Sequence, residues 1–82
     1  MTDEDIFERL TDIFRDVLDD DDIELRPETT AQDVKDWDSA NHINLVVATE
    51  MRFGIKFTNA EVEHLANVGD FVALIQKKLA AK

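Results

Sequence analysis

Cysteine is absent from the 82-residue sequence, and basic residues are scarce. Without cysteine the chain can form neither a disulfide framework nor a thiolate metal site, and any reactive thiol must arrive on a prosthetic group. Only 9 lysines and arginines stand against 19 aspartates and glutamates, which gives a formal charge of −10. A field of this sign repels nucleic acid and acidic membranes. Basic protein surfaces are therefore the expected partners, although acid in this amount can also serve solubility alone.

Long apolar runs are also missing, and none approaches the length needed to span a membrane. The N-terminal residues are acidic and lack the charged-then-apolar order of a signal peptide. These absences predict a cytoplasmic protein without a membrane span. The length predicts a single domain over residues 1–82, with a frayed tail at 80–82.

Apolar residues recur at steps of three and four near the N-terminus, as expected of an amphipathic helix. Thr2 is its predicted N-cap, with Asp5 three residues later. Aspartates 19–22 follow this helix, where negative charge is least favourable, and help to end it. They lack the glycine and the spacing of a calcium loop, so we expect a solvated acidic turn and no specific metal site. The residues assigned to the core are Ile6, Phe7, Leu10, Ile13, Phe14, Val17 and Leu18.

A long connector over residues 23–37 holds the only proline, Pro27, and is expected to pack on the core through its apolar side chains. A second helix is predicted from Ser39 to about Phe53, where Gly54 can adopt the left-handed conformation that closes a helix. The face of this helix assigned to the core consists of His42, Leu45, Val46, Thr49 and Phe53.

Two further helices are predicted after residue 54. Thr58 and Glu61 form a capping-box pattern for a short third helix. Asn67 is the predicted cap of the last helix, with Asp70 at its third position. The predicted fold is therefore all-α, a small bundle of three long helices and a short third helix, with a long first loop.

Asp38 and Ser39 stand at the start of the second helix. The short carboxylate of Asp38 can accept a hydrogen bond from the amide groups that a helix leaves unpaired at its start. Ser39 then occupies the first helical position, beside free N–H groups and the positive end of the helix dipole. A phosphate joined to its oxygen would be favoured there by up to about 1 kcal/mol. The position suits an attached phosphodiester.

The residues around Ser39 resemble the attachment motif of the acyl carrier protein family, in which a serine carries a 4′-phosphopantetheine arm. The motif here is Asp38-Ser39 followed by Ile43, Leu45, Val46, Ala48 and Glu50. The resemblance continues through Phe53-Gly54-Ile55, Thr58 and Asn67-Val68-Gly69-Asp70. It therefore spans nearly the whole chain in one register, and implies the acyl carrier protein fold.

The resemblance implies a carrier that is not itself an enzyme. A phosphopantetheinyl transferase would move the arm from coenzyme A to Ser39, with Asp38 as N-cap and recognition residue. The arm's thiol would hold acyl intermediates as thioesters for fatty-acid, polyketide-like or specialised lipid biosynthesis. The expected partners are acyl-transferring, condensing or ligating enzymes with basic docking surfaces, and the carrier itself would be a monomer.

The residues expected to dock these partners are Asp36, Ala40, Asn44, Val47 and Met51. An alternative for the apolar ones is partial burial under the connector. Ala40 stands where the family commonly has leucine, and uncharged residues replace much of the acid that is common in the second helix of fatty-acid carriers. These departures leave a specialised pathway as open as the primary fatty-acid pathway.

Two other classes of protein stay open at this point. One is a non-covalent, acidic helical adaptor that binds a basic protein. The other is a small hydrolase that uses Ser39 and His42, which lie one helical turn apart. A hydrolase would also need a group that orients the histidine and an oxyanion hole, and the sequence shows a recognisable pattern for neither.

Overall fold

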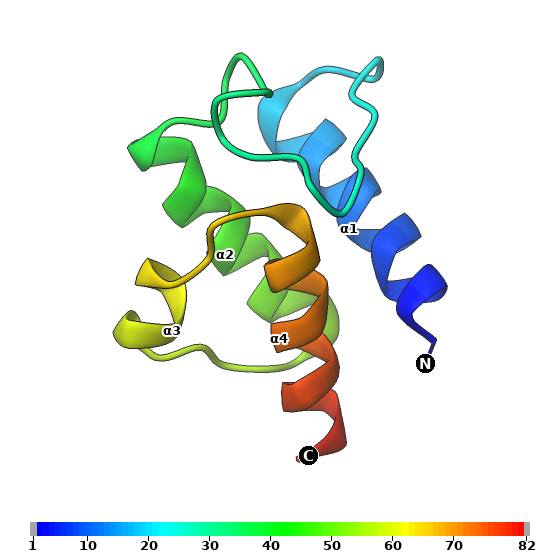
Figure 1. The fold of residues 1–82 in the computed structure, drawn as a ribbon, viewed down its shortest axis with the longest axis vertical. Helices are drawn as coiled ribbons and strands as arrows, with labels where there is room; N and C mark the ends of the chain where they lie inside the picture. The colour runs from blue at the N-terminus through cyan, green and yellow to red at the C-terminus, as the bar shows by residue number, and fades with distance from the viewer. Residues whose placement is uncertain (1, 82) are drawn as a thin grey trace.

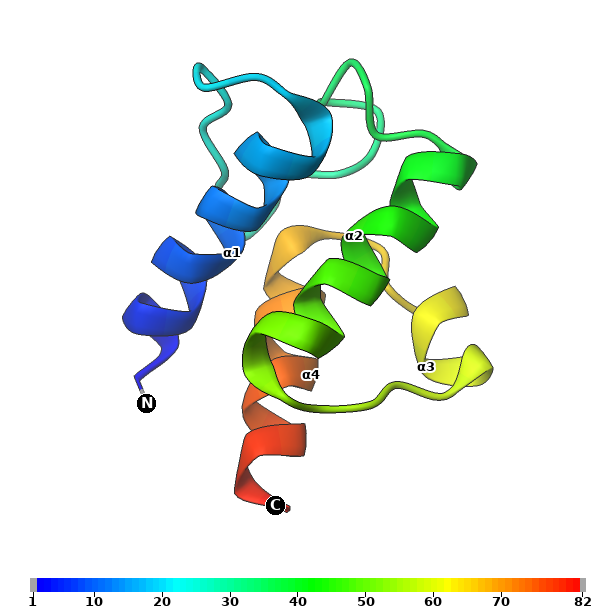
Figure 2. The same ribbon diagram turned by 180° about the vertical axis from the view of Figure 1, so that it is seen from behind.

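The computed structural model describes residues 2–81, which form four helices and no strand. Helices α1 (Asp3–Leu18), α2 (Ser39–Phe53) and α4 (Val68–Ala80) are long, whereas α3 (Asn59–Glu63) has 5 residues. α1 packs against both α2 and α4 (Figure 1). α3 lies on the side of the bundle away from α1, as the reverse view in Figure 2 also shows. The predicted all-α bundle with a long first loop is confirmed.

The predicted helix starts are confirmed by side-chain hydrogen bonds to the backbone. The Thr2 hydroxyl accepts from the Asp5 amide at 3.1 Å, and the Asp5 carboxylate accepts from the Thr2 amide at 3.4 Å. The Asn67 side chain accepts from the Asp70 amide at 2.8 Å. These bonds satisfy amide groups that have no partner inside a helix.

The helix ends depend on backbone conformation. Gly54 closes α2 with a φ of 66°, in the left-handed region that favours glycine. Asp19 closes α1 with a φ of 52°, a conformation that aspartate tolerates better than most residues. α4 extends to Ala80, and the fraying of residues 80–82 stays a prediction. The Ala81 amide closes that turn with a 3.1 Å bond to a carbonyl of the helix, while Lys82 lies outside the described residues.

Aspartates 19–22 form an exposed turn, as predicted. The Asp20 carboxylate accepts from the Asp22 amide at 3.0 Å and so orders the turn locally. Within residues 2–81, no group of three or more His, Asp or Glu side chains is arranged to hold a metal ion.

The core forms around Phe14, which is fully buried. Its ring meets Trp37 of the connector edge-on at a centroid distance of 5.0 Å, and Phe71 of α4 at 6.2 Å. Three segments that are distant in sequence therefore meet at one side chain. The other buried apolar residues are Ile6, Leu10, Ile13, Leu18, Ile23, Leu25, Leu45, Val46, Phe53, Ile55, Val68, Val72 and Ile75.

No helix within residues 2–81 has both the length and the apolar character that a membrane span requires.

The connector arches over one end of the bundle, from the end of α1 to the start of α2 (Figure 1). Its carbonyl oxygens at Pro27 and Thr29 accept hydrogen bonds from Gly69 at 2.7 Å and from Val68 at 2.9 Å. These are the first two amides of α4, which cannot bond inside their own helix. A Cβ at residue 69 would lie 2.9 Å from the Pro27 oxygen, so this close approach requires glycine. The predicted packing of the connector on the core is confirmed.

Candidate functional site

Ser39 is exposed where the connector meets the first turn of α2. The Asp38 carboxylate accepts from the Asn41 amide at 2.8 Å, which confirms Asp38 as the N-cap. Within the described residues, the Ser39 hydroxyl and the amides of Ser39 and Ala40 make no hydrogen bond. An anion joined to the Ser39 oxygen would thus lie beside two free N–H groups at the positive end of α2.

Backbone and side-chain hydrogen bonds order the turn that precedes Ser39. The Asp36 carbonyl accepts from the Asn41 side chain at 2.8 Å and from the Asp38 amide at 3.1 Å. The Trp37 amide donates to the Val34 carbonyl at 3.1 Å. The turn therefore presents Ser39 in one defined place while its hydroxyl remains accessible.

The His42 ring makes no hydrogen bond with Ser39. Its Nδ1 atom accepts from the Trp37 indole N–H at 2.9 Å, and its Nε2 atom lies 3.4 Å from the Val62 carbonyl oxygen of α3. Both ring nitrogens therefore contact groups other than Ser39. The geometry supports a structural role for this half-buried histidine. In this arrangement His42 is not placed to act as the general base of a hydrolase at Ser39.

A cavity of about 470 Å³ opens beside Ser39. Its position depends on tertiary packing, because the connector, the start of α2 and the region of α3 each supply part of its wall. The sequence assigned Val62 and Leu65 to the apolar side of the third helix but did not predict that residues from this region lie beside Ser39. The lining residues are Ala31, Trp37, Asp38, Ser39, His42, Ile43, Val62, Glu63 and Leu65.

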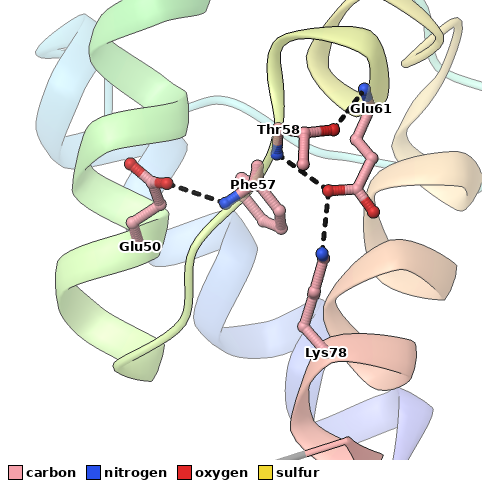
Figure 3. Close-up of polar contacts among 5 residues, drawn as sticks. All are labelled: Glu50, Phe57, Thr58, Glu61 and Lys78. Carbon is pink, nitrogen blue, oxygen red and sulfur yellow. Dashed lines mark hydrogen bonds and ion pairs between the residues drawn. The ribbon is translucent and has the colours of Figure 1, made fainter.

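α3 has no fully buried side chain, and polar contacts hold it and the segment before it in place (Figure 3). The Glu50 carboxylate of α2 accepts from the Phe57 amide at 2.8 Å. One oxygen of Glu61 accepts from the Thr58 amide and from the Lys78 ammonium of α4, each at 2.8 Å. The predicted capping box of Thr58 and Glu61 is confirmed, and it also forms an ion pair that joins α3 to α4.

The ion pair has a pH dependence that can be tested. The Lys78 ammonium, with the Thr58 amide, lowers the pKa of Glu61 from 4.5 to about 2. A carboxylate whose pKa is lowered on folding stabilises the fold above the unfolded pKa, and that contribution is lost as the pH falls through the folded pKa. Glu61 therefore stabilises the fold fully above pH 4.5 and ceases to do so near pH 2.

We expect Glu61→Gln to lower the thermal midpoint at neutral pH, because the amide can still cap the Thr58 N–H but carries no charge for Lys78. The difference from the wild type should shrink between pH 4.5 and 2. Thermal melts across this range measure it. Glu63→Gln, the same exchange at an exposed position of α3, is the matched control. A difference that stays constant with pH would contradict the assignment.

The outward side of α2 forms an exposed strip, here called the α2 surface, of Ala40, Ile43, Asn44, Val47 and Met51. Val47 is 47% exposed and Met51 is 79% exposed, so the alternative of burial under the connector is wrong for them. Ile43 is 54% exposed and was missed as a surface residue. Its spacing could have revealed it, since it lies four residues from both Ser39 and Val47. The docking candidate Asp36 is also exposed, on the turn before the helix.

Comparison with known proteins agrees with this geometry. A family profile described as a phosphopantetheine attachment site matches residues 8–75. The acyl carrier protein of Thermotoga maritima is 34% identical over 76 residues, which cover 93% of this chain and 94% of that protein. The meromycolate extension acyl carrier protein of Mycolicibacterium smegmatis is 36% identical over 76 residues, covering 93% and 77%.

A solved structure agrees as well. The solution NMR structure of a holo acyl carrier protein from Geobacter metallireducens matches with a TM-score of 0.88 and 49% identity, and the match covers 93% of this chain and 87% of that one. The profile and the fold together define a phosphopantetheine-attachment domain. The chain belongs to the acyl carrier protein family. Its prosthetic group is a covalently attached 4′-phosphopantetheine, and it functions as an acyl carrier.

Proposed function

We propose that Ser39 carries the phosphopantetheine, within a single carrier domain formed by residues 1–82. The observation that supports this is the Ser39 hydroxyl at the start of α2, beside the Asp38 cap, where this hydroxyl and the amides of Ser39 and Ala40 have no hydrogen-bond partner among residues 2–81. Ser39 is also the only serine in the sequence. The chain thus offers one exposed primary hydroxyl, in a place that favours a phosphodiester.

The prosthetic group supplies, when bound, the thiol that the cysteine-free chain lacks, and acyl groups are held there as thioesters. The chain's own residues present the hydroxyl and order the turn around it. Asp38 has two tasks in this proposal, since its carboxylate caps α2 and its exposed position lets a phosphopantetheinyl transferase recognise it. We assign the chain no catalytic step of its own, because the ring nitrogens of His42 are directed at Trp37 and Val62.

Mass spectrometry after incubation with coenzyme A and a broad-specificity phosphopantetheinyl transferase tests the assignment. The proposal predicts one addition, on the peptide that contains Ser39. An unmodified chain under conditions that modify a known acyl carrier protein would favour the adaptor alternative. Labelling of Ser39 by a serine-reactive probe in the absence of transferase would favour the hydrolase.

The α2 surface, together with Asp36, is the proposed docking site for partner enzymes in the cytoplasm. Its centre is apolar, and the first turn of α2 contains no acidic residue. Partners with an apolar contact patch and basic residues around it would complement this surface and the overall charge of −10. The similarity to a meromycolate extension carrier supports a specialised lipid pathway for this monomeric carrier.

We expect Val47→Glu and Met51→Glu to impair partner enzymes more than they lower stability. Both side chains are exposed, so the unfolding free energy should change by about 0.5 kcal/mol or less. The kcat/KM of a partner enzyme should fall about tenfold, because a charge at the centre of an interface must be desolvated.

Ala73→Glu is the matched control, since it adds the same charge at an exposed position of α4. It should leave both the stability and the partner kinetics close to the wild type. A large loss of stability in Val47→Glu, with unchanged partner kinetics, would remove this residue from the docking site.

A further inference from the structure

His42 is a half-buried side chain beside Ser39 to which the proposed function assigns no task. We infer that His42 is a positioning residue for the modification of Ser39. Through its contacts with Trp37 and Val62, it connects α3 with the turn on which Ser39 lies. The inference rests on the proposed role of Ser39. It concerns how the hydroxyl is held in place for the transferase.

The two hydrogen bonds of the ring define its tautomer. An indole N–H can only donate, so the 2.9 Å contact with Trp37 requires Nδ1 of His42 to accept. The proton of the neutral ring is then on Nε2, which lies 3.4 Å from the Val62 carbonyl oxygen. The planes of the two rings differ by only 15°, as expected when the indole N–H points at the edge of the imidazole. The neutral ring therefore makes one contact with each of two separate segments.

Trp37 transmits the position of His42 to the turn before Ser39. Its side chain is only 4% exposed and contacts Phe14 in the core, and its indole N–H donates to His42. The backbone of Trp37 lies two residues before Ser39. Loss of the acceptor would leave a buried donor unpaired, which favours rearrangement of this turn.

Val62 transmits the same restraint to α3. This helix has no fully buried side chain, and the His42 contact adds to its polar anchorage through Glu61 and Lys78. His42 also lines the cavity beside Ser39. The ring therefore fixes the distance between the Ser39 turn and the opposite wall of this cavity.

Protonation of the His42 ring would break its hydrogen bond with Trp37. A second proton on the ring makes Nδ1 a donor, so that it faces the donor of Trp37. The charged groups that face the cavity beside the ring are Asp38, at the end of the connector, and Glu63, from α3. Both are acidic, so the cavity lining offers carboxylate acceptors to a protonated ring, whereas the indole N–H can only donate.

Three variants of the unmodified protein test the inference. His42→Phe keeps an aromatic ring and removes both hydrogen bonds. His42→Asn places an amide oxygen near the position of Nδ1 and can still accept from Trp37. Trp37→Phe removes the donor and keeps a ring against Phe14. The readouts are the modification kinetics with a phosphopantetheinyl transferase and the NMR signal of the indole N–H, which is unique because the chain has one tryptophan.

In His42→Phe we expect the KM of the transferase for the carrier to rise about three- to tenfold, the size of one net hydrogen bond, with little change in kcat. The KM rises because the transferase must select the fraction of molecules in which the turn is in place. His42→Asn should restore the KM to within about twofold of the wild type. Trp37→Phe should raise it as His42→Phe does, and the double variant should be no worse than either single one.

The position of the indole N–H signal provides an independent readout. It should move in His42→Phe, which removes the acceptor of the indole N–H, and lie close to the wild-type position in His42→Asn. It should not move in His64→Phe, which removes the other histidine, an exposed side chain of α3's C-cap. An indole signal that does not respond to His42 overturns the inference.

The kinetic outcomes separate this inference from the proposed function. Modification of His42→Phe with the wild-type KM overturns the inference alone, as do additive effects in the double variant. If His42→Phe does not fold, Trp37→Phe and its KM decide in the same way. A wild-type chain that accepts no arm at Ser39 overturns the proposed function, and the positioning role falls with it.

Discussion

Ser39→Ala is expected to accept no phosphopantetheine, a complete loss of the mass addition seen with the wild type. The transfer needs a nucleophilic oxygen at this position, and alanine has none. The fold should persist, because Asp38 still caps α2 and alanine is a good residue for the first turn of a helix. The unfolding free energy should stay within about 0.5 kcal/mol of the wild type. Mass spectrometry and chemical denaturation measure the two quantities.

Thr11→Ala is a suitable control for Ser39→Ala. It removes a hydroxyl from α1 that donates to the Phe7 carbonyl at 2.8 Å, and should be modified at the wild-type rate. Modification of Ser39→Ala would show that the arm is attached elsewhere. Unfolding of Ser39→Ala would instead give the serine a structural role that the free hydroxyl in the structure does not suggest.

Phe14→Ala is expected to remove much of the stability of the fold. The side chain is fully buried and lies between Trp37 and Phe71, so its removal leaves a cavity where the connector, α1 and α4 meet. Substitutions of this kind cost about 3–5 kcal/mol. A chain of 82 residues has about 4–12 kcal/mol in total, so Phe14→Ala is expected to remove about a quarter of this stability or more. Denaturant titration followed by circular dichroism measures this loss.

Phe7→Ala is the matched control, because it truncates the same residue type in the same helix at a half-buried position. We expect it to cost about 1–2 kcal/mol and to leave the protein folded. Equal losses for Phe7 and Phe14 would contradict the placement of the core centre at Phe14. Phe14→Ala should also slow modification of Ser39, since Trp37 would lose the ring against which it packs.

The helices and their caps were predictable because they depend on interactions between residues that are close in the sequence. Thr2 and Asp5, or Thr58 and Glu61, form capping boxes across three residues, and no tertiary contact is required to recognise them. The place of Ser39 follows in the same way, because Asp38 caps α2 through an amide only three residues later. The spacing of apolar residues likewise indicated which faces of α1 and α2 are buried.

The surroundings of Ser39 depend on contacts between distant parts of the chain, which no local pattern encodes. The His42 ring is oriented by Trp37 and by a carbonyl of α3 that lies 20 residues further along the chain. The sequence predicts that Glu61 belongs to a capping box, yet only the packing of α3 beside α4 places its carboxylate 2.8 Å from the Lys78 ammonium. The cavity beside Ser39 likewise needs three segments to come together. Short-range hydrogen bonds and periodicity therefore placed the serine, whereas tertiary packing decided which side chains surround it.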